Sequence, residues 1–283
     1  MNKLRIGLPS KGRLAEQAEE LFKQAGLSFR RQPRSLFALV GELPIEVTFL
    51  RTEDIPVLCA EGAIDMGVTG SDLVAESGSD LVTRMSLGVG KCRLAVCVPE
   101  DSHIRAPAEL SGCRVATSFP RVTAQYLRRH VSQVHLVPLS GSVEIMVALG
   151  VAEAIVDLVE TGSTLAANQL RVLDEIGRYE TVLIQNRQPR DPEMADRVAR
   201  RLEGIVIARS YSLLEYNIPR NKLSEAERVT PGFNSPTVSA LEDPAWCAVR
   251  AMVRRSEVMQ VMEQLEEVGA SAILEIPISN CRL

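Results

Sequence analysis

Two stretches of the sequence repeat one pattern: residues 62–73 read GAIDMGVTGSDL, and residues 153–165 read EAIVDLVETGSTL. In each, a small residue, an isoleucine, an aspartate and apolar residues precede Thr-Gly-Ser and helix-forming residues. This is the pattern of a strand that ends in a loop and enters a helix. Two α/β lobes that each carry this unit would place two similar loops across one cleft. Chance recurrence of common strand-to-helix chemistry is the alternative.

The alternation of strand and helix extends outward from these stretches to about residue 208. Residues 4–9 are rich in strand formers, and residues 10–26 form an amphipathic pattern that ends at Gly26. Further strand and helix segments follow in turn, which predicts parallel α/β sheets. The expected lobes are residues 1–95 with 182–208, and residues 96–181.

The order of predicted strands and helices changes after about residue 208. The segments that follow have the order β-α-β-β-α-β of a ferredoxin-like module. No acid–base or phosphate-binding motif occurs in them, so residues 209–283 are expected to form a sensing or assembly domain. The predicted strands are 211–219, 237–242, 246–254 and 272–278, and the predicted helices are 221–229 and 256–269.

Composition places the chain among ordinary soluble proteins. It has 283 residues, of which 46% are hydrophobic, with a net charge of −4 and a mean hydropathy of +0.04. This length suits roughly two domains. An acidic chain is a poor candidate for non-specific nucleic-acid binding, which needs a basic face. No apolar run approaches the ~20 residues that span a bilayer, so no membrane segment is expected.

The cysteines and histidines do not form a metal motif. None of the six cysteines is in a C-x-x-C pair, and the three histidines lack zinc-ligand spacing. Several cysteines lie in apolar runs, so buried free thiols are expected. The N-terminal segment lacks the apolar core of a signal peptide. Together these features favour the reducing cytoplasm.

The loop at residues 161–164 reads Thr-Gly-Ser-Thr and predicts a phosphate site. A strand that enters a helix through such a loop presents backbone N–H groups and the positive end of the helix dipole. Thr161, Ser163 and Thr164 add hydroxyl groups, and Gly162 allows close approach or positive φ. The Walker A pattern is absent. Simple N-capping of the helix is the alternative.

Two acids just before this loop indicate a sugar attached to the phosphate. Carboxylates at Asp157 and Glu160 can accept hydrogen bonds from vicinal ribose hydroxyls. They can also stabilise positive charge on a ribose ring in an oxocarbenium-like transition state. A 5-phosphoribosyl group therefore fits the motif better than free phosphate. The alternative is that the acids only complement the helix dipole.

At these residues the sequence resembles the ATP phosphoribosyltransferase family. The segments GLPSKGRL, RTEDIPVLCAEGAIDMGVTGSDL, TPGFNSPTVSAL and GASAILEIPIS resemble the family as well, so the likeness spans essentially the whole chain. The positions that match the family signature in spacing are Glu144, Gly150, Ala152, Ile155, Asp157, Leu158, Thr161, Gly162, Thr164 and Leu165.

The resemblance implies a reaction and an architecture. ATP and phosphoribosyl pyrophosphate would give N1-(5-phosphoribosyl)-ATP and pyrophosphate, with Mg²⁺ held largely by the substrate phosphates rather than by a dedicated protein site. This is the first step of histidine biosynthesis. The implied fold is a two-lobed, type II periplasmic-binding-protein-like catalytic core with a C-terminal ferredoxin-like regulatory domain. The resemblance also implies dimers that associate into hexamers, inhibition by L-histidine and AMP, and no nucleic-acid or membrane partner.

The resemblance also distributes roles along the sequence. The phosphoribosyl pyrophosphate site would contain Asp157, Glu160, Thr161, Gly162, Ser163, Thr164 and Leu165. Lys11 and Arg13 lie at the first strand-to-helix turn, where ligands collect in α/β folds, and would act with the two acids in catalysis. Arg51 and the loop at residues 69–72 are expected at the nucleotide as well. The alternative for the three cations is that they are only solvated at the surface, and the alternative for residues 69–72 is helix capping. The expected ATP site contains Lys11, Gly12, Arg13, Arg51, Thr69, Gly70 and Asp72.

The tail carries a weaker implication. Relatives in the family suggest a histidine pocket at Asn217, Thr237, Met252 and Ala272. An acid is expected near position 217 in some relatives, and here the residue is asparagine. Glu215 is a nearby substitute.

Two other classes of protein fit parts of the pattern. A non-catalytic solute-binding protein also has two lobes and a cleft, but two acids beside a phosphate loop exceed what a simple anion binder needs. A regulatory subunit without catalysis would have no chemical reason to keep DLVETGSTL intact. The enzyme is therefore the leading hypothesis.

Overall fold

The computed structural model describes residues 3–32 and 35–282. The chain divides into two compact units. The larger consists of Met1–Glu20 with Phe29–Ala199, and the smaller of Leu21–Ser28 with Arg200–Leu283. The larger unit contains two sheets, and we call the regions around them the first and second lobes.

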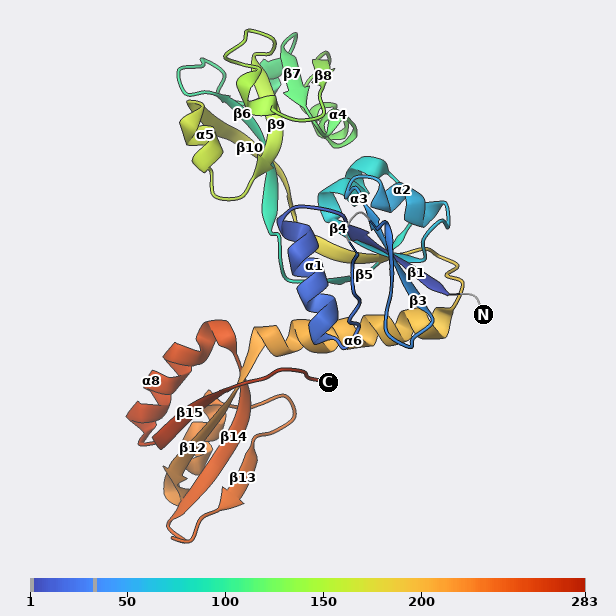
Figure 1. The fold of residues 1–283 in the computed structure, drawn as a ribbon. Coiled ribbons are helices and arrows are strands. Elements are labelled where there is room, and N and C mark those ends of the chain that lie inside the picture. Colours follow the sequence, from blue (N-terminus) through green and yellow to red (C-terminus); the bar gives the residue numbers. More distant parts are fainter. Residues whose placement is uncertain (1–2, 33–34, 283) are drawn as a thin grey trace. The chain divides into compact units, whose positions relative to one another are not determined.

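The sheet of the first lobe has the strand order β2-β3-β1-β4-β11-β5, and Figure 1 labels its strands β1, β3, β4 and β5. Three of its strands, β3, β1 and β4, are parallel, whereas β11 runs antiparallel to β4 and β5. All residues of β1 except Arg5 are buried, as expected for a strand covered on both faces of the sheet. The strands are β1 (Leu4–Pro9), β2 (Phe37–Leu39), β3 (Ile45–Leu50), β4 (Met66–Gly70), β5 (Val82–Ser86) and β11 (Thr181–Gln185), and the helices are α1 (Arg13–Gln24), α2 (Ile55–Ala60) and α3 (Ser71–Ser77).

The sheet of the second lobe has the order β10-β6-β9-β7-β8. Strands β8, β7 and β9 are parallel, and β6 runs antiparallel to both β9 and β10. Apolar clusters cover both faces of this sheet, one around Leu94 and Val156 and the other around Ala95 and Ile155. The strands are β6 (Cys92–Pro99), β7 (Arg114–Thr117), β8 (His135–Pro138), β9 (Ala154–Val159) and β10 (Leu170–Tyr179), and the helices are α4 (Pro120–Leu127) and α5 (Ser163–Ala167).

The sheets correct the prediction that the lobes would be wholly parallel. Strand–helix–strand units give parallel neighbours in both lobes, as expected. The antiparallel strands β6, β10 and β11 flank the two points where the chain passes between the sheets. Strand β10 was not predicted, because its sequence LRVLDEIGRY shows no alternation and its side chains are mostly half-buried.

Two helical segments also differ from the prediction. The sequence VEIMVALG at 143–150 predicted a helix, but it forms only a 3-10 turn at Val143–Ile145. The chain leaves the helical conformation at Gly150, which has a φ of +69°. Conversely, the 19-residue helix α6 (Pro192–Ser210) was not predicted.

The smaller unit has the predicted ferredoxin-like arrangement. Its antiparallel sheet has the order β13-β14-β12-β15. Strand β12 alternates between buried and half-buried residues, and helix α8 ends at Gly269 with a φ of +102°, as the sequence indicated. The elements are β12 (Tyr211–Pro219), α7 (Leu223–Val229), β13 (Thr237–Ala240), β14 (Trp246–Arg254), α8 (Val258–Val268) and β15 (Ser271–Pro277).

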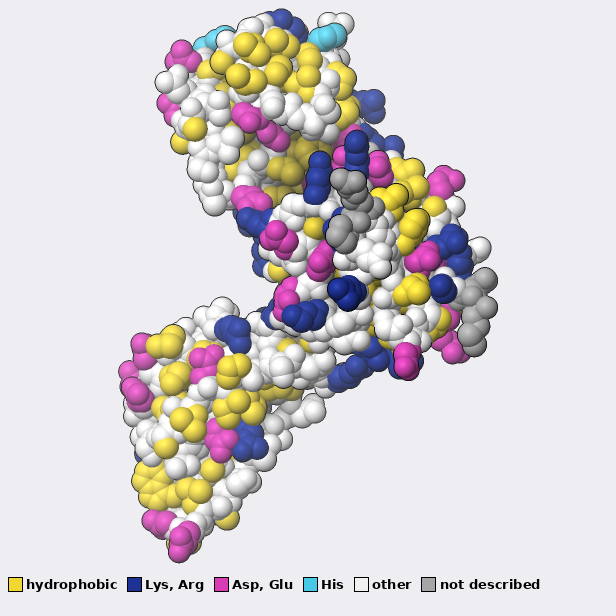
Figure 2. Space-filling view, viewed as in Figure 1, with side chains coloured by type: hydrophobic (Ala, Val, Ile, Leu, Met, Phe, Trp, Pro, Cys, Tyr) yellow, Lys and Arg dark blue, Asp and Glu magenta, His cyan; other side chains and the backbone are white. Residues whose placement is uncertain are grey.

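The surface and the cysteines have ordinary features. On the face drawn in Figure 2, Lys and Arg side chains are interspersed with Asp and Glu rather than gathered into one basic surface. All six cysteines are free, and Cys59, Cys97 and Cys247 are buried. Among the helices that the structure describes, none is both long enough and apolar enough to cross a bilayer.

A carboxylate from the first lobe caps a helix of the second. Glu76 on α3 accepts hydrogen bonds from the backbone N–H of Arg121, at 2.8 Å, and of Val122, at 2.9 Å. These amides belong to the first turn of α4, where no intrahelical acceptor exists. Phe119, which precedes the helix, provides no side-chain cap. Glu76 therefore replaces a local cap and joins the two lobes.

We predict that Glu76→Ala destabilises the larger unit by about 1 kcal/mol, because two amide donors of α4 lose their acceptor. Denaturant unfolding of the full chain measures this change. Glu16→Ala, at an exposed position on α1, is the matched control and should change stability by no more than ~0.5 kcal/mol. Equal effects of the two substitutions would contradict the role of Glu76 as a cap.

Candidate active site

The repeated unit of the second lobe forms one wall of a polar cavity. This cavity has a volume of about 280 Å³ and lies at the carboxyl end of β9. Three carboxylates face it together with the Thr-Gly-Ser-Thr loop. The lining residues are Glu144, Asp157, Leu158, Val159, Glu160, Thr161, Gly162, Ser163, Thr164 and Leu165.

The two predicted acids are in different environments. Asp157 is half-buried, and burial raises the pKa of its carboxyl group, opposed by a hydrogen bond from the backbone N–H of Leu158. The nearby charge of Glu144 raises this pKa further. Glu160 is exposed and accepts hydrogen bonds from Arg13, 3.2 and 3.3 Å from its two oxygens. The structure therefore brings Arg13 of the first lobe to the acids of the second.

The phosphate loop has the open conformation that an anion needs. Gly162 has a φ of +83°, a region that strongly favours glycine. It occupies the N-cap position of α5, so no side chain caps this helix. The hydroxyl groups of Thr161 and Ser163 are 3.0 Å apart, and both side chains are exposed. The first amides of α5 have no intrahelical acceptor. The Ser163 amide donates to Thr161 Oγ1 at 3.5 Å, and the residues that carry these hydroxyl and amide groups line one cavity.

The corresponding loop of the first lobe is closed. The hydroxyl of Thr69 is buried and donates to the carbonyl of Thr52 at 3.1 Å. Asp72 is buried, which raises the pKa of its carboxyl group, while hydrogen bonds from its own amide and that of Leu73 lower it. The carboxylate also lies against Gly70, where an added Cβ would be 2.0 Å from Asp72 Oδ1. The Asp72 carboxylate therefore occupies the position that an anion would take.

The other cations predicted to hold ATP lie along one edge of the first sheet. Strands β1 and β3 are parallel, and the amide of Ser10 donates to the carbonyl of Leu50 at 2.7 Å. Lys11 and Arg51, which follow these strands, are both exposed. Gly12 has a φ of +82° and precedes α1. The loops after β1, β3 and β4 are thus at the same sheet edge, where ligands of α/β proteins bind.

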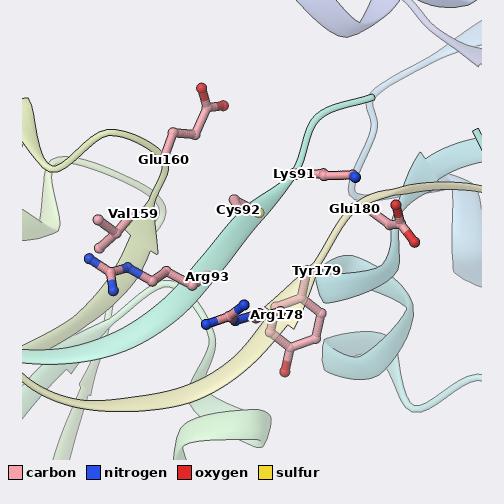
Figure 3. Close-up of a pocket in the computed structure, with 8 residues that line it drawn as sticks. All are labelled: Lys91, Cys92, Arg93, Val159, Glu160, Arg178, Tyr179 and Glu180. Carbon is pink, nitrogen blue, oxygen red and sulfur yellow. The ribbon is translucent and has the colours of Figure 1, made fainter. Parts of the chain in front are cut away.

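A second cavity, which the sequence did not predict, adjoins the first. It has a volume of about 420 Å³ and shares Val159 and Glu160 with the cavity of the phosphate loop. Its other walls come from the two segments that connect the lobes (Figure 3). The available sequence signal was a basic pair, Lys91 and Arg93, flanking Cys92 at the start of β6. The lining residues are Lys91, Cys92, Arg93, Val159, Glu160, Arg178, Tyr179 and Glu180.

The residues predicted to bind histidine lie in the smaller unit. Asn217 on β12 and Met252 on β14 are half-buried, in alternation with the buried residues of their strands. Thr237 is exposed and pairs with Arg250. Glu215, the acid considered as a substitute, already binds Arg250 at 2.7 Å. Ala272 on β15 is exposed and has a φ of +49°.

The family models and the curated relatives agree on one family. A family model described as ATP phosphoribosyltransferase matches residues 51–204. A second model, described as HisG, C-terminal domain, matches residues 208–280. An ATP phosphoribosyltransferase from Rhodopirellula baltica is 66% identical over 280 residues, covering 99% of this chain and 94% of that protein.

More distant relatives have the same name. An ATP phosphoribosyltransferase from Saccharopolyspora erythraea is 41% identical over 281 residues, covering 99% of this chain and all of that protein. Among solved structures, the ATP phosphoribosyl transferase (HisG:HisZ) complex from Thermotoga maritima matches with a TM-score of 0.62 at 29% identity. That match covers 72% of this chain and 97% of the other.

The raised pKa of Asp157 predicts a pH-dependent effect on stability. Because the folded chain holds this proton more tightly than the unfolded chain, stability is lost as the pH rises from about 3.9, the usual pKa of aspartate, through the folded pKa. Asp157→Asn removes this loss. The variant should unfold at a higher temperature than the wild type at pH 7, and the difference should vanish below about pH 4.

Thermal unfolding across this pH range tests the prediction. Glu144→Gln should reduce the same loss in a chain that retains Asp157, because Glu144 contributes to the raised pKa. A difference between Asp157→Asn and wild type that is independent of pH would show that titration of Asp157 does not cause it.

Proposed function

The chain belongs to the ATP phosphoribosyltransferase family, and we propose that the cavity at residues 157–165 is its site for phosphoribosyl pyrophosphate. The enzyme transfers the 5-phosphoribosyl group to N1 of ATP, giving N1-(5-phosphoribosyl)-ATP and pyrophosphate in the first step of histidine biosynthesis. The match to the C-terminal domain model makes this chain the long form of the family.

The observation that carries this assignment is one cavity lined both by three carboxylates and by the Thr-Gly-Ser-Thr loop. The donors of residues 161–165 suit the 5-phosphate. Asp157 and Glu160 suit the ribose hydroxyls, which donate to carboxylates. The difference between the loops supports the choice of lobe, since Asp72 fills the amide site of the first lobe and Thr164 stands at the equivalent position in the second.

The first lobe is our proposed site for ATP. Arg13 forms an ion pair with Glu160, which lines the phosphoribosyl cavity. Lys11 and Arg51 follow neighbouring parallel strands. These cations, with Gly12 and the 69–72 loop, would surround a nucleotide that faces the ribose. The buried side chains of Thr69 and Asp72 would shape this site, with the backbone rather than the hydroxyl of Thr69 facing the ligand.

The proposed chemistry depends mainly on orientation. The lone pair of adenine N1 forms the new bond to C1 of the ribose. At the same time the C1–O bond breaks, and the electron pair of that bond leaves with pyrophosphate. No strong general base is needed for that step. The cleft would hold N1 in line with C1, while Asp157 and Glu160 stabilise positive charge that develops on the ribose ring.

A metal ion fits this scheme when it is bound to the substrate phosphates. Among the described residues there is no group of three or more His, Cys, Asp or Glu side chains suited to hold a metal. Mg²⁺ typically binds proteins through one or two carboxylates together with substrate phosphates. We therefore propose that Mg²⁺ enters on the substrates, where it would neutralise charge on the departing pyrophosphate.

The tail is the proposed regulatory site. Asn217, Thr237 and Met252 lie on neighbouring strands of one sheet, which supports a shared effector site for L-histidine. AMP is a second proposed inhibitor, through the nucleotide site. We also propose a cytoplasmic enzyme that forms dimers and hexamers; the free cysteines suit a reducing compartment.

We predict that the purified chain releases pyrophosphate only when ATP, phosphoribosyl pyrophosphate and Mg²⁺ are all present. Asp157→Asn should lower kcat by about 100-fold or more, the usual effect of removing one transition-state charge contact. Binding of ribose 5-phosphate should survive, because its phosphate is held by the 161–165 loop. A coupled pyrophosphate assay and calorimetry measure the two quantities.

These measurements separate the enzyme from the other two classes. No release by the wild type, with both ligands still bound, would support a regulatory subunit and reject the proposed activity. Undiminished turnover by Asp157→Asn would instead reject the role given to this carboxylate.

We predict that Thr237→Ala weakens inhibition by L-histidine without lowering turnover in its absence. Loss of one hydrogen-bonding side chain should raise the half-inhibitory concentration by about fivefold to tenfold. Inhibition curves for the wild type and variant provide the measurement, with Ser224→Ala, an exposed position on α7, as the control. Unchanged inhibition would show that the effector binds elsewhere.

A further inference from the structure

Helix α3 belongs to the first lobe but is attached to the second lobe at several points. Its Leu73 packs against the apolar cluster of the second lobe that contains Leu94. The half-buried carboxylate of Glu76 caps α4. A Cβ added at Gly78 would overlap the guanidinium group of Arg121 on α4, so the two helices are in close contact there. These contacts involve none of the residues that line the two cavities of the candidate site.

The α3 contact and the phosphoribosyl cavity are on opposite faces of the second sheet. Leu73 and α4 pack on the face that carries Leu94 and Val156. Leu165 of α5 packs on the other face together with Val159, and both of these residues line the phosphoribosyl cavity. Figure 1 shows α4 and α5 on the two sides of this sheet. The two lobes are therefore in contact on one face of the sheet, and the cavity opens on the other.

The connections between the lobes form a two-stranded ribbon that continues β6 and β10. These strands are paired as far as Cys92 and Tyr179. Beyond that pair, the amide of Leu87 donates to the carbonyl of Thr181 at 2.9 Å, and the amide of Thr181 donates to the carbonyl of Val89 at 3.0 Å. Bending within the plane of the ribbon would slide its strands past one another and break these bonds, whereas bending toward either face preserves them. Bending toward a face is therefore the easier motion of the lobes.

Such bending has opposite effects on the two sides of the sheet. Motion that brings the α5 face toward the first lobe closes the phosphoribosyl cavity and separates α4 from α3. At the cavity, the lobes are joined by the ion pair of Arg13 and Glu160, whose side chains are 65% and 51% exposed, and exposed pairs contribute little to stability. On the α4 side, Glu76 accepts two charge-assisted hydrogen bonds at the positive end of the helix. The stronger contact is thus the one that opposes closure.

We propose that Glu76 is a positioning residue that restrains closure of the cleft. It acts through α4, because its hydrogen bonds to the amides of Arg121 and Val122 must lengthen when the second lobe bends toward the α5 side. The restraint lowers the fraction of closed molecules, and the affinity for a ligand that contacts both lobes falls with that fraction. The inference rests on the proposed function, which makes N1-(5-phosphoribosyl)-ATP a ligand of both lobes and ribose 5-phosphate a ligand of the second lobe alone.

We predict that Glu76→Ala binds N1-(5-phosphoribosyl)-ATP about threefold to tenfold more tightly than the wild type, the factor that corresponds to loss of one helix cap. Glu76→Gln keeps one acceptor oxygen and should give a smaller increase in affinity. Ribose 5-phosphate should bind equally to the wild type and both variants. Calorimetry with the full chain measures these affinities. Gln125→Ala, at an exposed position on α4, is the matched control and should bind both ligands as the wild type does.

Tighter binding by a less stable protein separates a restraint from a purely structural role. If Glu76 only stabilised α4, Glu76→Ala would bind both ligands as the wild type does or more weakly, and either result would overturn the proposal. Failure of the wild type to bind N1-(5-phosphoribosyl)-ATP would reject the proposed function, and this inference with it. Binding of that ligand with equal affinity by the wild type and both variants would reject only the restraint.

Hydrogen exchange in the wild type tests the same inference without a substitution. When N1-(5-phosphoribosyl)-ATP binds, the amides of Arg121 and Val122 should exchange about threefold or more faster, because closure withdraws their acceptor. The amides of residues 161–165 should exchange more slowly in the same sample. Mass spectrometry with fragmentation resolves the two segments. Unchanged or slower exchange at Arg121 and Val122 would show that the Glu76 cap stays in place during binding, and would overturn the proposal.

Discussion

Antiparallel pairing of β6 with β10 is the constraint on which the cleft depends. The pairs run from Leu170 opposite Pro99 to Tyr179 opposite Cys92, with two register shifts between them. Because β6 follows one passage between the lobes and β10 precedes the other, this pairing holds the two connections side by side. It also sets which residues of β10 lie in line with β9. A slip of one residue would turn Arg178 to the other face of the sheet and away from Asp157.

The parts of the fold that depend on neighbouring residues could be predicted from the sequence, whereas those that depend on distant pairing could not. The strand–loop–helix units and the ferredoxin-like tail follow local periodicity and turn residues, and Gly269 ends α8 where the pattern indicated. Strand β10 was missed because its stability comes from pairing with β6 and not from its own alternation. The candidate site shows the same division: the acids and the phosphate loop are contiguous, but Arg93 and Arg178 are brought together only by register.

Similar sequences in the two lobes lead to different local chemistry. Gly70 is extended, with φ −76° and ψ 141°, whereas Gly162 is in the left-handed region. The fourth residue of each loop also differs. Asp72 accepts hydrogen bonds from the amides of its own helix, whereas in the second lobe the Ser163 amide donates to Thr161 Oγ1 at 3.5 Å. The sequence repeat indicated two loops at a cleft, but it could not indicate that one of them is internally satisfied. A carboxylate and a phosphate compete for the same donors, so an aspartate at this position occupies amides that could otherwise bind a phosphate, without changing the fold.

The self-capped loop has a consequence for the direction in which a substrate can enter the cleft. Two open loops facing each other would accept a molecule with a phosphate at one end in either of two orientations, and only one of these would present the reactive carbon correctly. With Asp72 supplying its own negative charge, the reversed orientation meets electrostatic repulsion as well as a lack of free donors. At the proposed site, the asymmetry of the two loops would therefore favour one orientation of the substrate before any chemical step begins.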